Sequence, residues 1–305
     1  MVQGFEDFAG FDEFDLATSA TTIHGRRGGS GPPVLLLHGI PETHLMWHRV
    51  APRLAEHLSV VATDLRGYGS SGTPPSAPDH APYSMREIAR EQVEVMRALG
   101  FDRFAVVGHD RGARCAYRLA LDHPEVVSHL AVLDIIPTGD VSRRPSWELN
   151  LAFWVWSFLA APEPVPEEMI LAAPDVIVGH MLDAWSDGAD GVDGPDGPDV
   201  FPAEVRAHYV DQFRDPATVH AICEEYRAAG TLDVDHDEAD RGRRRIACPT
   251  LALWSASGAF ASWFDPLDVW RSWSDDVRGA AIDAGHFLAE EAPDEVTHHL
   301  LELLT

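Results

Sequence analysis

The stretch Gly108-His109-Asp110-Arg111-Gly112 joins an apolar segment at residues 104–107 to an amphipathic segment at residues 111–122. The first segment has the apolar composition of a buried strand, and the second has a helical pattern that Pro124 ends. Glycines on both sides of Asp110 permit a turn that is too tight for neighbouring side chains. We therefore expect a strand, a sharp turn and a helix, with Asp110 raised above the sheet and the helix N-terminus behind it.

Short apolar segments and amphipathic segments alternate on both sides of this turn. Ser84 and Glu87, three residues apart, form a pattern typical of a capping box at a helix start. Such alternation indicates an α/β fold with a mostly parallel sheet flanked by helices. The sequence predicts further strands at residues 34–38, 59–63, 130–135, 250–254 and 278–282, and helices at residues 84–99, 266–273 and 293–304.

Residues 137–245 interrupt the alternation. This segment contains tryptophan-rich helical patterns and many prolines, and it shows no convincing strand pattern. We interpret it as a helical cap inserted into one α/β core, which comprises residues 1–136 and residues 246–305. Within the cap, residues 187–198 form four Asp-Gly-x triplets. Calcium-binding loops share this pattern, but we interpret the triplets as a solvated loop of low complexity.

The overall charge excludes several functions. The chain has 305 residues and a formal charge of −26, with 49 acidic residues against 23 arginines and no lysine. Nucleic acids and anionic membranes both require a basic face, so we expect neither as a partner. The three cysteines show no CxxC pair, which excludes a disulfide framework and a cysteine zinc site. No signal-peptide pattern is visible, and the longest apolar stretch is too short for a membrane span, so we expect a cytoplasmic protein.

Three further motifs lie at predicted strand ends. They are His38-Gly39, the stretch Asp-Leu-Arg-Gly-Tyr-Gly-Ser at residues 64–70, and Gly285-His286-Phe287. Together with the turn at residues 108–112, these motifs resemble the α/β-hydrolase superfamily over nearly the whole chain. The resemblance implies the α/β-hydrolase fold and places Asp110 at the position of the nucleophile.

An aspartate nucleophile favours a particular chemistry. A carboxylate attacks amides poorly but displaces a leaving group from saturated carbon, which produces an alkyl ester of the enzyme. We expect His286 to activate the water that hydrolyses this ester, while backbone N–H groups of Arg111 and Ile40 stabilise the oxyanion. Substrates suited to this chemistry are chiefly alkyl halides and epoxides.

His286 requires an acid that orients its ring and stabilises its protonated form. The predicted strand at residues 250–254 runs into Ser-Ala-Ser-Gly-Ala at residues 255–259, which contains no acid. Asp265 is the nearest candidate, but it begins a predicted helix, so we interpret it as a helix cap. We assign the role to Asp134, at the end of the strand that follows the nucleophile helix.

Arg111 and Arg114 distinguish this turn. Residues three apart in the first turn of a helix share a face, and two guanidinium groups there can bind an anion through paired hydrogen bonds. Both could instead be surface arginines in ordinary ion pairs. Arg111 directly follows Asp110, however, where haloalkane dehalogenases have tryptophan. This placement favours a substrate that is itself a carboxylate.

At this point the sequence resembles the fluoroacetate (haloacetate) dehalogenase family across almost its full length. The family resemblance implies the triad Asp110, Asp134 and His286, and a substrate carboxylate held by Arg111 and Arg114. It also implies a homodimer and no cofactor. The motifs that carry the resemblance lie at residues 108–114 (Gly-His-Asp-Arg-Gly-Ala-Arg), 134–138 (Asp-Ile-Ile-Pro-Thr), 153–156 (Phe-Trp-Val-Trp), 223–228 (Cys-Glu-Glu-Tyr-Arg-Ala), 266–270 (Pro-Leu-Asp-Val-Trp) and 284–288 (Ala-Gly-His-Phe-Leu).

The same resemblance implies the halide site. Trp156 and Tyr226 would donate hydrogen bonds to the departing halide, and Trp185 would form part of the pocket wall. Members of the family that release fluoride usually carry histidine before the cap tryptophan, whereas this chain has Val155. Fluoride gains most from each donor because its charge density is high, and losing a donor costs a few kcal/mol. We therefore predict that chloride and bromide leave in preference to fluoride.

Two other functions remain open, and no metal site is expected. An epoxide hydrolase shares the aspartate nucleophile but usually needs two cap tyrosines, for which Tyr209 and Tyr226 are available. A ligand receptor without catalysis could use the same fold. His44 and His48 are spaced like zinc ligands on a helix, but the glutamate of the zinc-protease motif is missing. We interpret them as surface histidines.

Overall fold

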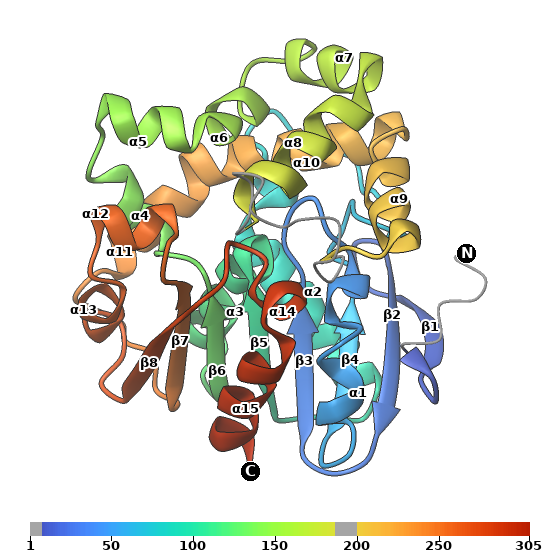
Figure 1. Ribbon diagram of the computed structural model, residues 1–305, viewed down its shortest axis with the longest axis vertical. Coiled ribbons are helices and arrows are strands. Elements are labelled where there is room, and N and C mark those ends of the chain that lie inside the picture. The colour runs from blue at the N-terminus through green and yellow to red at the C-terminus, as the bar shows by residue number, and fades with distance from the viewer. Residues whose placement is uncertain (1–7, 187–199) are drawn as a thin grey trace.

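The computed structural model describes residues 8–186 and 200–305. The Asp-Gly-x triplets at residues 187–198 lie outside the described residues. An eight-stranded sheet in the order β1-β2-β4-β3-β5-β6-β7-β8 forms the centre (Figure 1). Strands β1 and β2 are antiparallel to their neighbours, and every pair from β4 to β8 is parallel. The α/β-hydrolase architecture predicted for the chain is thus present.

The central parallel strands are buried in the middle of the molecule, whereas the edge strand β8 is mostly not buried. In β5, all six residues from Phe104 to His109 are buried, because helices cover both faces of the sheet. Figure 1 shows α2 and α3 behind the sheet and α1 and α15 in front of it. The strands are β1 (Asp12–Ala17), β2 (Thr22–Gly29), β3 (Pro33–Leu37), β4 (Ser59–Thr63), β5 (Phe104–His109), β6 (Val127–Leu133), β7 (Thr250–Ser255) and β8 (Val277–Ile282).

The helices of the core alternate with these strands. Those outside the segment between β6 and β7 are η2 (His44–Trp47), α1 (Ala51–Leu54), η3 (Ala81–Tyr83), α2 (Met85–Ala98), α3 (Asp110–Asp122), α12 (Ala259–Trp263), α13 (Pro266–Arg271), α14 (Leu288–Glu291) and α15 (Pro293–Leu304). Within the described ranges, no helix is both long enough and apolar enough to cross a lipid bilayer.

A layer of helices connects β6 to β7. Figure 1 shows most of these helices above the ends of the parallel strands. We propose that these helices form the cap, with residues 137–245 as its boundaries, and that residues 1–136 and 246–305 form the two parts of the core. The cap helices are α4 (Thr138–Ser142), α5 (Trp147–Ala152), α6 (Trp154–Leu159), α7 (Val165–Ala172), α8 (Pro174–Trp185), α9 (Ala203–Gln212), α10 (Pro216–Ala228), η4 (Ala229–Asp233) and α11 (Val234–Asp240).

Two features of the core differ from the sequence-based expectations. Strands β1 and β2 were not predicted, because their alternating, glycine-rich and charged residues contain no apolar run. The capping box at α2 was also wrong in its contacts. Ser84 occupies the N-cap, but its hydroxyl donates to the Ala81 carbonyl oxygen at 3.0 Å. Glu87 instead pairs with Arg90 at 2.6 Å.

Candidate active site

The turn between β5 and α3 presents Asp110 in a left-handed backbone conformation, with φ of 41°. Its two glycines are required by close backbone contacts. A Cβ at Gly108 would lie 2.3 Å from the Gly112 carbonyl oxygen, and a Cβ at Gly112 would lie 2.4 Å from that of Leu37. A non-glycine residue with positive φ is strained, and here the packed backbone on both sides holds Asp110 in that conformation.

The loop after β3 completes the surroundings of Asp110. The Ile40 N–H donates to Asp110 Oδ2 at 3.2 Å, which places this donor where the predicted oxyanion would form. A Cβ at Gly39 would lie 2.6 Å from the Asp110 Cβ, so glycine is needed at this approach. Burial opposes the ionisation of Asp110, but the nearby His286 ring and Arg114 guanidinium outweigh it and hold the pKa of Asp110 below its ordinary value. The carboxylate is therefore ionised and available as a nucleophile.

The structure brings His286 and Asp134 together. His286 Nδ1 lies 2.6 Å from Asp134 Oδ2, and the Ser255 N–H donates to Asp134 Oδ1 at 3.0 Å. Asp134 directly follows β6 and has a φ of 49°, the same strained region as Asp110. Asp265, the alternative acid, accepts a hydrogen bond from the Asp268 N–H at 3.0 Å as the N-cap of α13. The arrangement around His286 is that of a base oriented by a carboxylate.

Arg111 and Arg114 are buried, with 2% and 1% of their surfaces exposed, so they are not surface ion-pair residues. Arg111 Nε donates to Glu225 Oε1 at 2.6 Å, and its guanidinium lies over the Tyr226 ring at 4.5 Å. Burial disfavours its charge, but the Glu225 carboxylate raises the pKa of Arg111 above its ordinary value.

Arg114 is held by a different set of contacts. One guanidinium nitrogen donates to Thr138 Oγ1 at 2.8 Å and to the Ile136 carbonyl oxygen at 3.2 Å. The guanidinium also lies over the Trp156 ring at 4.7 Å. Burial and the like charge of Arg111 hold the pKa of Arg114 below its ordinary value. Two like charges forced together in this way favour the binding of an anion between them.

Several donors at this position remain unsatisfied. Within residues 8–186 and 200–305, Arg111 Nη2, Arg114 Nε and Nη2, and the Tyr226 hydroxyl have no hydrogen-bond partner. Leaving one such group unpaired costs roughly 1–3 kcal/mol, and more when it is charged. An anionic ligand could accept hydrogen bonds from such donors.

A cavity of about 230 Å³ opens beside these donors. Its wall combines the two arginines with apolar and aromatic side chains from the cap, a composition suited to a small molecule with one charged end. The residues that line it are Arg111, Arg114, Thr138, Val141, Ser142, Pro145, Leu149, Asn150, Phe153, Trp156, Ser157, Ala160, Tyr226, Ala229, Gly230 and Val234.

Four predicted site residues line this cavity, and six do not. Those that do not are Asp110, Asp134, His286, Ile40, Val155 and Trp185. Val155 has 1% of its surface exposed and packs in the main hydrophobic core. Trp185 packs edge-on against His286, with ring centroids 5.6 Å apart, and its carbonyl oxygen accepts from the His286 N–H at 2.7 Å. Trp185 therefore contacts the predicted base itself, whereas the predicted effect of Val155 on the halide stays a prediction.

Glu225 and Thr138 are residues of the site that the sequence-based analysis did not single out. Each one fixes an arginine, and both lie in motifs that carry the family resemblance, at residues 223–228 and 134–138. A search for partners of two buried guanidinium groups would have suggested a carboxylate such as Glu225, because buried charges require pairing.

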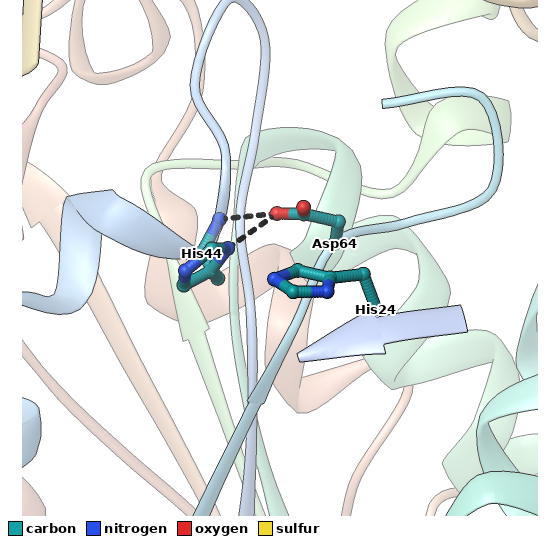
Figure 2. A group of neighbouring side chains, drawn as sticks. All are labelled: His24, His44 and Asp64. Atoms are coloured by element: carbon teal, nitrogen blue, oxygen red, sulfur yellow. Dashed lines mark hydrogen bonds and ion pairs between the residues drawn. The ribbon is translucent and has the colours of Figure 1, made fainter. Parts of the chain in front are cut away.

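A second cluster of polar side chains joins the loops after β3 and β4. Figure 2 shows both contacts from His44 meeting one oxygen of Asp64, with the His24 ring beside them. The His44 N–H and Nδ1 lie 2.8 and 2.7 Å from Asp64 Oδ1, and the Ser70 N–H donates to Oδ2 at 2.9 Å. His44 and His48 have only 4% and 1% of their surfaces exposed, so their interpretation as surface histidines was wrong.

This cluster could bind a metal ion by its chemistry alone. One atom from each of His24, His44 and Asp64 lies within 4.8 Å of the others. The hydrogen bonds of Asp64 nevertheless give the cluster a structural role, since they tie two loops together. The expectation that the protein needs no metal or cofactor remains a prediction.

Comparisons with known proteins agree with this fold. The profile of the α/β hydrolase fold matches residues 32–293. A fluoroacetate dehalogenase from Burkholderia sp is 45% identical over 98% of this chain and 95% of its own length. A soluble epoxide hydrolase from Corynebacterium sp. (strain C12) is 30% identical over 90% of both chains. The crystal structure of a proposed α/β hydrolase from Nostoc sp PCC 7120 superposes with a TM-score of 0.92 and 44% identity, over 100% of this chain and 99% of the other.

Proposed function

Because the chain belongs to the haloacetate dehalogenases of the α/β-hydrolase superfamily, we propose that it converts short 2-halocarboxylates to the hydroxy acid and halide. The enzyme is a hydrolase that acts on carbon–halide bonds. The observation that carries the choice of substrate is the pair Arg111 and Arg114, buried beside the ionised Asp110 with unsatisfied donors. In such a substrate the α-carbon carries both the halogen and the carboxylate. The carboxylate would accept hydrogen bonds from these donors while Asp110 faces the α-carbon.

The first step is displacement at carbon. An oxygen of Asp110 supplies the electron pair of a new C–O bond to the α-carbon, and the carbon–halogen bond breaks with its electrons leaving on the halide. Trp156 and Tyr226 are proposed as the donors that stabilise the halide. Support comes from their place beside the arginines, where the Tyr226 hydroxyl has no partner among the described residues.

The second step hydrolyses the ester. His286 Nε2 takes a proton from water, and the hydroxide adds to the carboxyl carbon of Asp110. The Ile40 N–H, which already contacts Asp110 Oδ2 at 3.2 Å, stabilises the oxyanion. Collapse of this intermediate expels the hydroxy acid, which takes the proton from His286, and Asp110 returns to its carboxylate with release of one proton. Asp134 stabilises the charge of His286 between these transfers.

Tyr209 favours this function over epoxide hydrolysis. An epoxide hydrolase needs two tyrosines that donate to the epoxide oxygen, and Tyr209 is the second tyrosine available in the cap. Its side chain is fully buried, and its hydroxyl donates to Glu290 Oε1 at 3.1 Å. Of these two cap tyrosines, Tyr226 is the one that lies at the arginine pair. We therefore take the 30% identity to an epoxide hydrolase as support for a shared fold and nucleophile, and not for a shared substrate.

A panel of halide-release assays tests the proposal. We expect chloroacetate and bromoacetate to be hydrolysed, fluoroacetate weakly or not at all, and the Asp110→Asn variant to be inactive. The covalent ester should appear on the peptide that contains Asp110 in single-turnover experiments. Diol formation from styrene oxide without halide release from chloroacetate would support an epoxide hydrolase, and absence of any ester would support a ligand receptor.

We also propose a homodimer located in the cytoplasm. Support for the dimer comes from large apolar side chains exposed on the cap, among them Trp147 at 73%, Met169 at 59% and Val176 at 72%. Exposed apolar groups of this size gather where proteins associate. We expect light scattering on the purified protein to give the mass of a dimer. The mass of a monomer would contradict the proposal.

A further inference from the structure

His109, immediately before Asp110, is fully buried and uses both ring nitrogens. Its Nδ1 lies 2.8 Å from Glu42 Oε2, and its Nε2 lies 2.8 Å from the backbone carbonyl oxygen of His286. The two imidazole rings of His109 and His286 are 4.5 Å apart between centroids. His109 is therefore the side chain that joins the nucleophile turn to the loop of the predicted base.

Both acceptors indicate that His109 carries a proton on each nitrogen. A carbonyl oxygen and a carboxylate only accept hydrogen bonds, so both ring nitrogens must donate. Burial alone would disfavour the charged ring, but the Glu42 carboxylate raises the pKa of His109 to about 9. A buried imidazolium held in two charge-assisted contacts has little freedom to rotate.

Glu42 lies beside a second buried carboxyl group, that of Glu290. Glu42 and Glu290 have no measurable exposure, and the Glu42 carboxylate also accepts from the Gly39 N–H at 3.2 Å. Burial and the adjacent Glu42 raise the pKa of Glu290 well above its ordinary value, which favours the protonated form of Glu290. The Tyr209 hydroxyl donates to Glu290 Oε1 at 3.1 Å. Glu42 is thus the carboxyl partner of His109 in this buried cluster.

We propose that His109 is a positioning residue for His286, acting through its hydrogen bond to the His286 carbonyl and anchored by Glu42. This inference rests on the proposed function, since it assigns His109 to the ester-hydrolysis step. Asp134 orients the His286 ring from one side, whereas His109 fixes the backbone that carries the ring.

The proposal separates the two chemical steps. Formation of the ester requires Asp110, which the backbone of the turn presents, and His286 takes no part in breaking the carbon–halogen bond. Hydrolysis of the ester depends on the position of the His286 ring, and a displacement of a catalytic group by about 1 Å can lower the rate about 100-fold. Loss of the His109 contact should therefore slow the second step and leave the first.

Rapid mixing of the His109→Gln and His109→Asn variants with excess chloroacetate tests this. We expect a burst of chloride of about one equivalent per active site, followed by turnover roughly 10–100-fold slower than in the wild type. Mass spectrometry should find the carboxymethyl ester on the peptide that contains Asp110. Glu42→Gln keeps the side-chain shape and should give the same burst with a smaller loss of turnover.

The matched control is His44→Asn, a buried histidine with 4% exposure that contacts Asp64 and not His286. It should lower the melting temperature without producing a burst. Equal slowing of both steps in the His109 and Glu42 variants, or wild-type turnover in them, would overturn the assignment. No halide from the wild-type enzyme would overturn the proposed function and this inference with it.

Discussion

Asp134 Oδ2 and His286 Nδ1 lie 2.6 Å apart, although 152 residues separate them in the chain. The parallel pairing of β6 with β7 and of β7 with β8 brings their loops to the same edge of the sheet. The Ser255 N–H, at the end of β7, holds the other oxygen of Asp134. Five predictions follow from this site and its surroundings.

Replacing Asp134 with Asn should remove the acceptor that fixes the His286 tautomer. We expect kcat for chloroacetate to fall by about 10²–10⁴-fold, because a comparable change in a serine hydrolase triad has an effect of this size. Steady-state chloride release would measure it. A variant that retains most of its activity would show that another acid serves His286, and Asp265→Asn is the control, expected to change stability alone.

Replacing Arg114 with Gln should weaken the binding of the substrate carboxylate. We expect kcat/KM for chloroacetate to fall by about 100-fold or more, since a buried charged hydrogen bond contributes a few kcal/mol. Thr138→Val, which removes one partner of Arg114, should raise KM by a smaller factor. If neither variant affects kcat/KM for chloroacetate, the carboxylate binds elsewhere.

Replacing Val155 with His should raise the rate of fluoride release relative to chloride release. An added donor favours the halide of highest charge density, by up to a few kcal/mol. Val155 is buried in the core, so the imidazole should also lower stability by roughly 1–3 kcal/mol. Because a loss of stability lowers both release rates alike, the ratio of fluoride release to chloride release is the quantity to compare. Val155→Leu is the control, since it changes the side chain without adding a donor. An unchanged ratio would place the halide away from residue 155.

The stability of the protein should depend on the charge of His109 at alkaline pH. Its pKa is raised from 6.5 to about 9 by Glu42, Asp110 and Asp134 against the effect of burial. The stabilisation is complete below the ordinary pKa of 6.5 and is lost as the pH rises through about 9. Urea unfolding at about pH 7 and about pH 10 should show a larger loss for the wild type than for His109→Gln. Equal losses would mean that His109 is neutral in the folded protein.

Removing metal ions should leave turnover unchanged, because neither proposed step uses a metal. Chloride release would be compared before and after dialysis against a chelator. A loss of activity that zinc restores would instead assign a metal to the His24–His44–Asp64 cluster. His24→Gln, which removes one of the three ligands, would then show the same loss.

Local sequence patterns determined much of this protein. The apolar runs of β3 to β8 and the glycines around Asp110 predict the sheet and its turn, because each depends on neighbours in the chain. The spacing of Arg111 and Arg114 likewise predicted a shared face. Strands β1 and β2 escaped prediction because their residues lack an apolar run and become strands through pairing with the sheet.

Tertiary structure alone decided which side chains support the site. Glu225 reaches Arg111 across 114 positions, and Glu42 reaches His109 across 67. No local pattern distinguishes either carboxylate, because the sequence contains 49 acidic residues. Only folding shows which of them are buried. Burial makes an unpaired charge costly, so the fold selects Glu225 and Glu42 as partners of the arginine and the histidine. The sequence therefore predicted which groups react, and the folded chain determined how they are held.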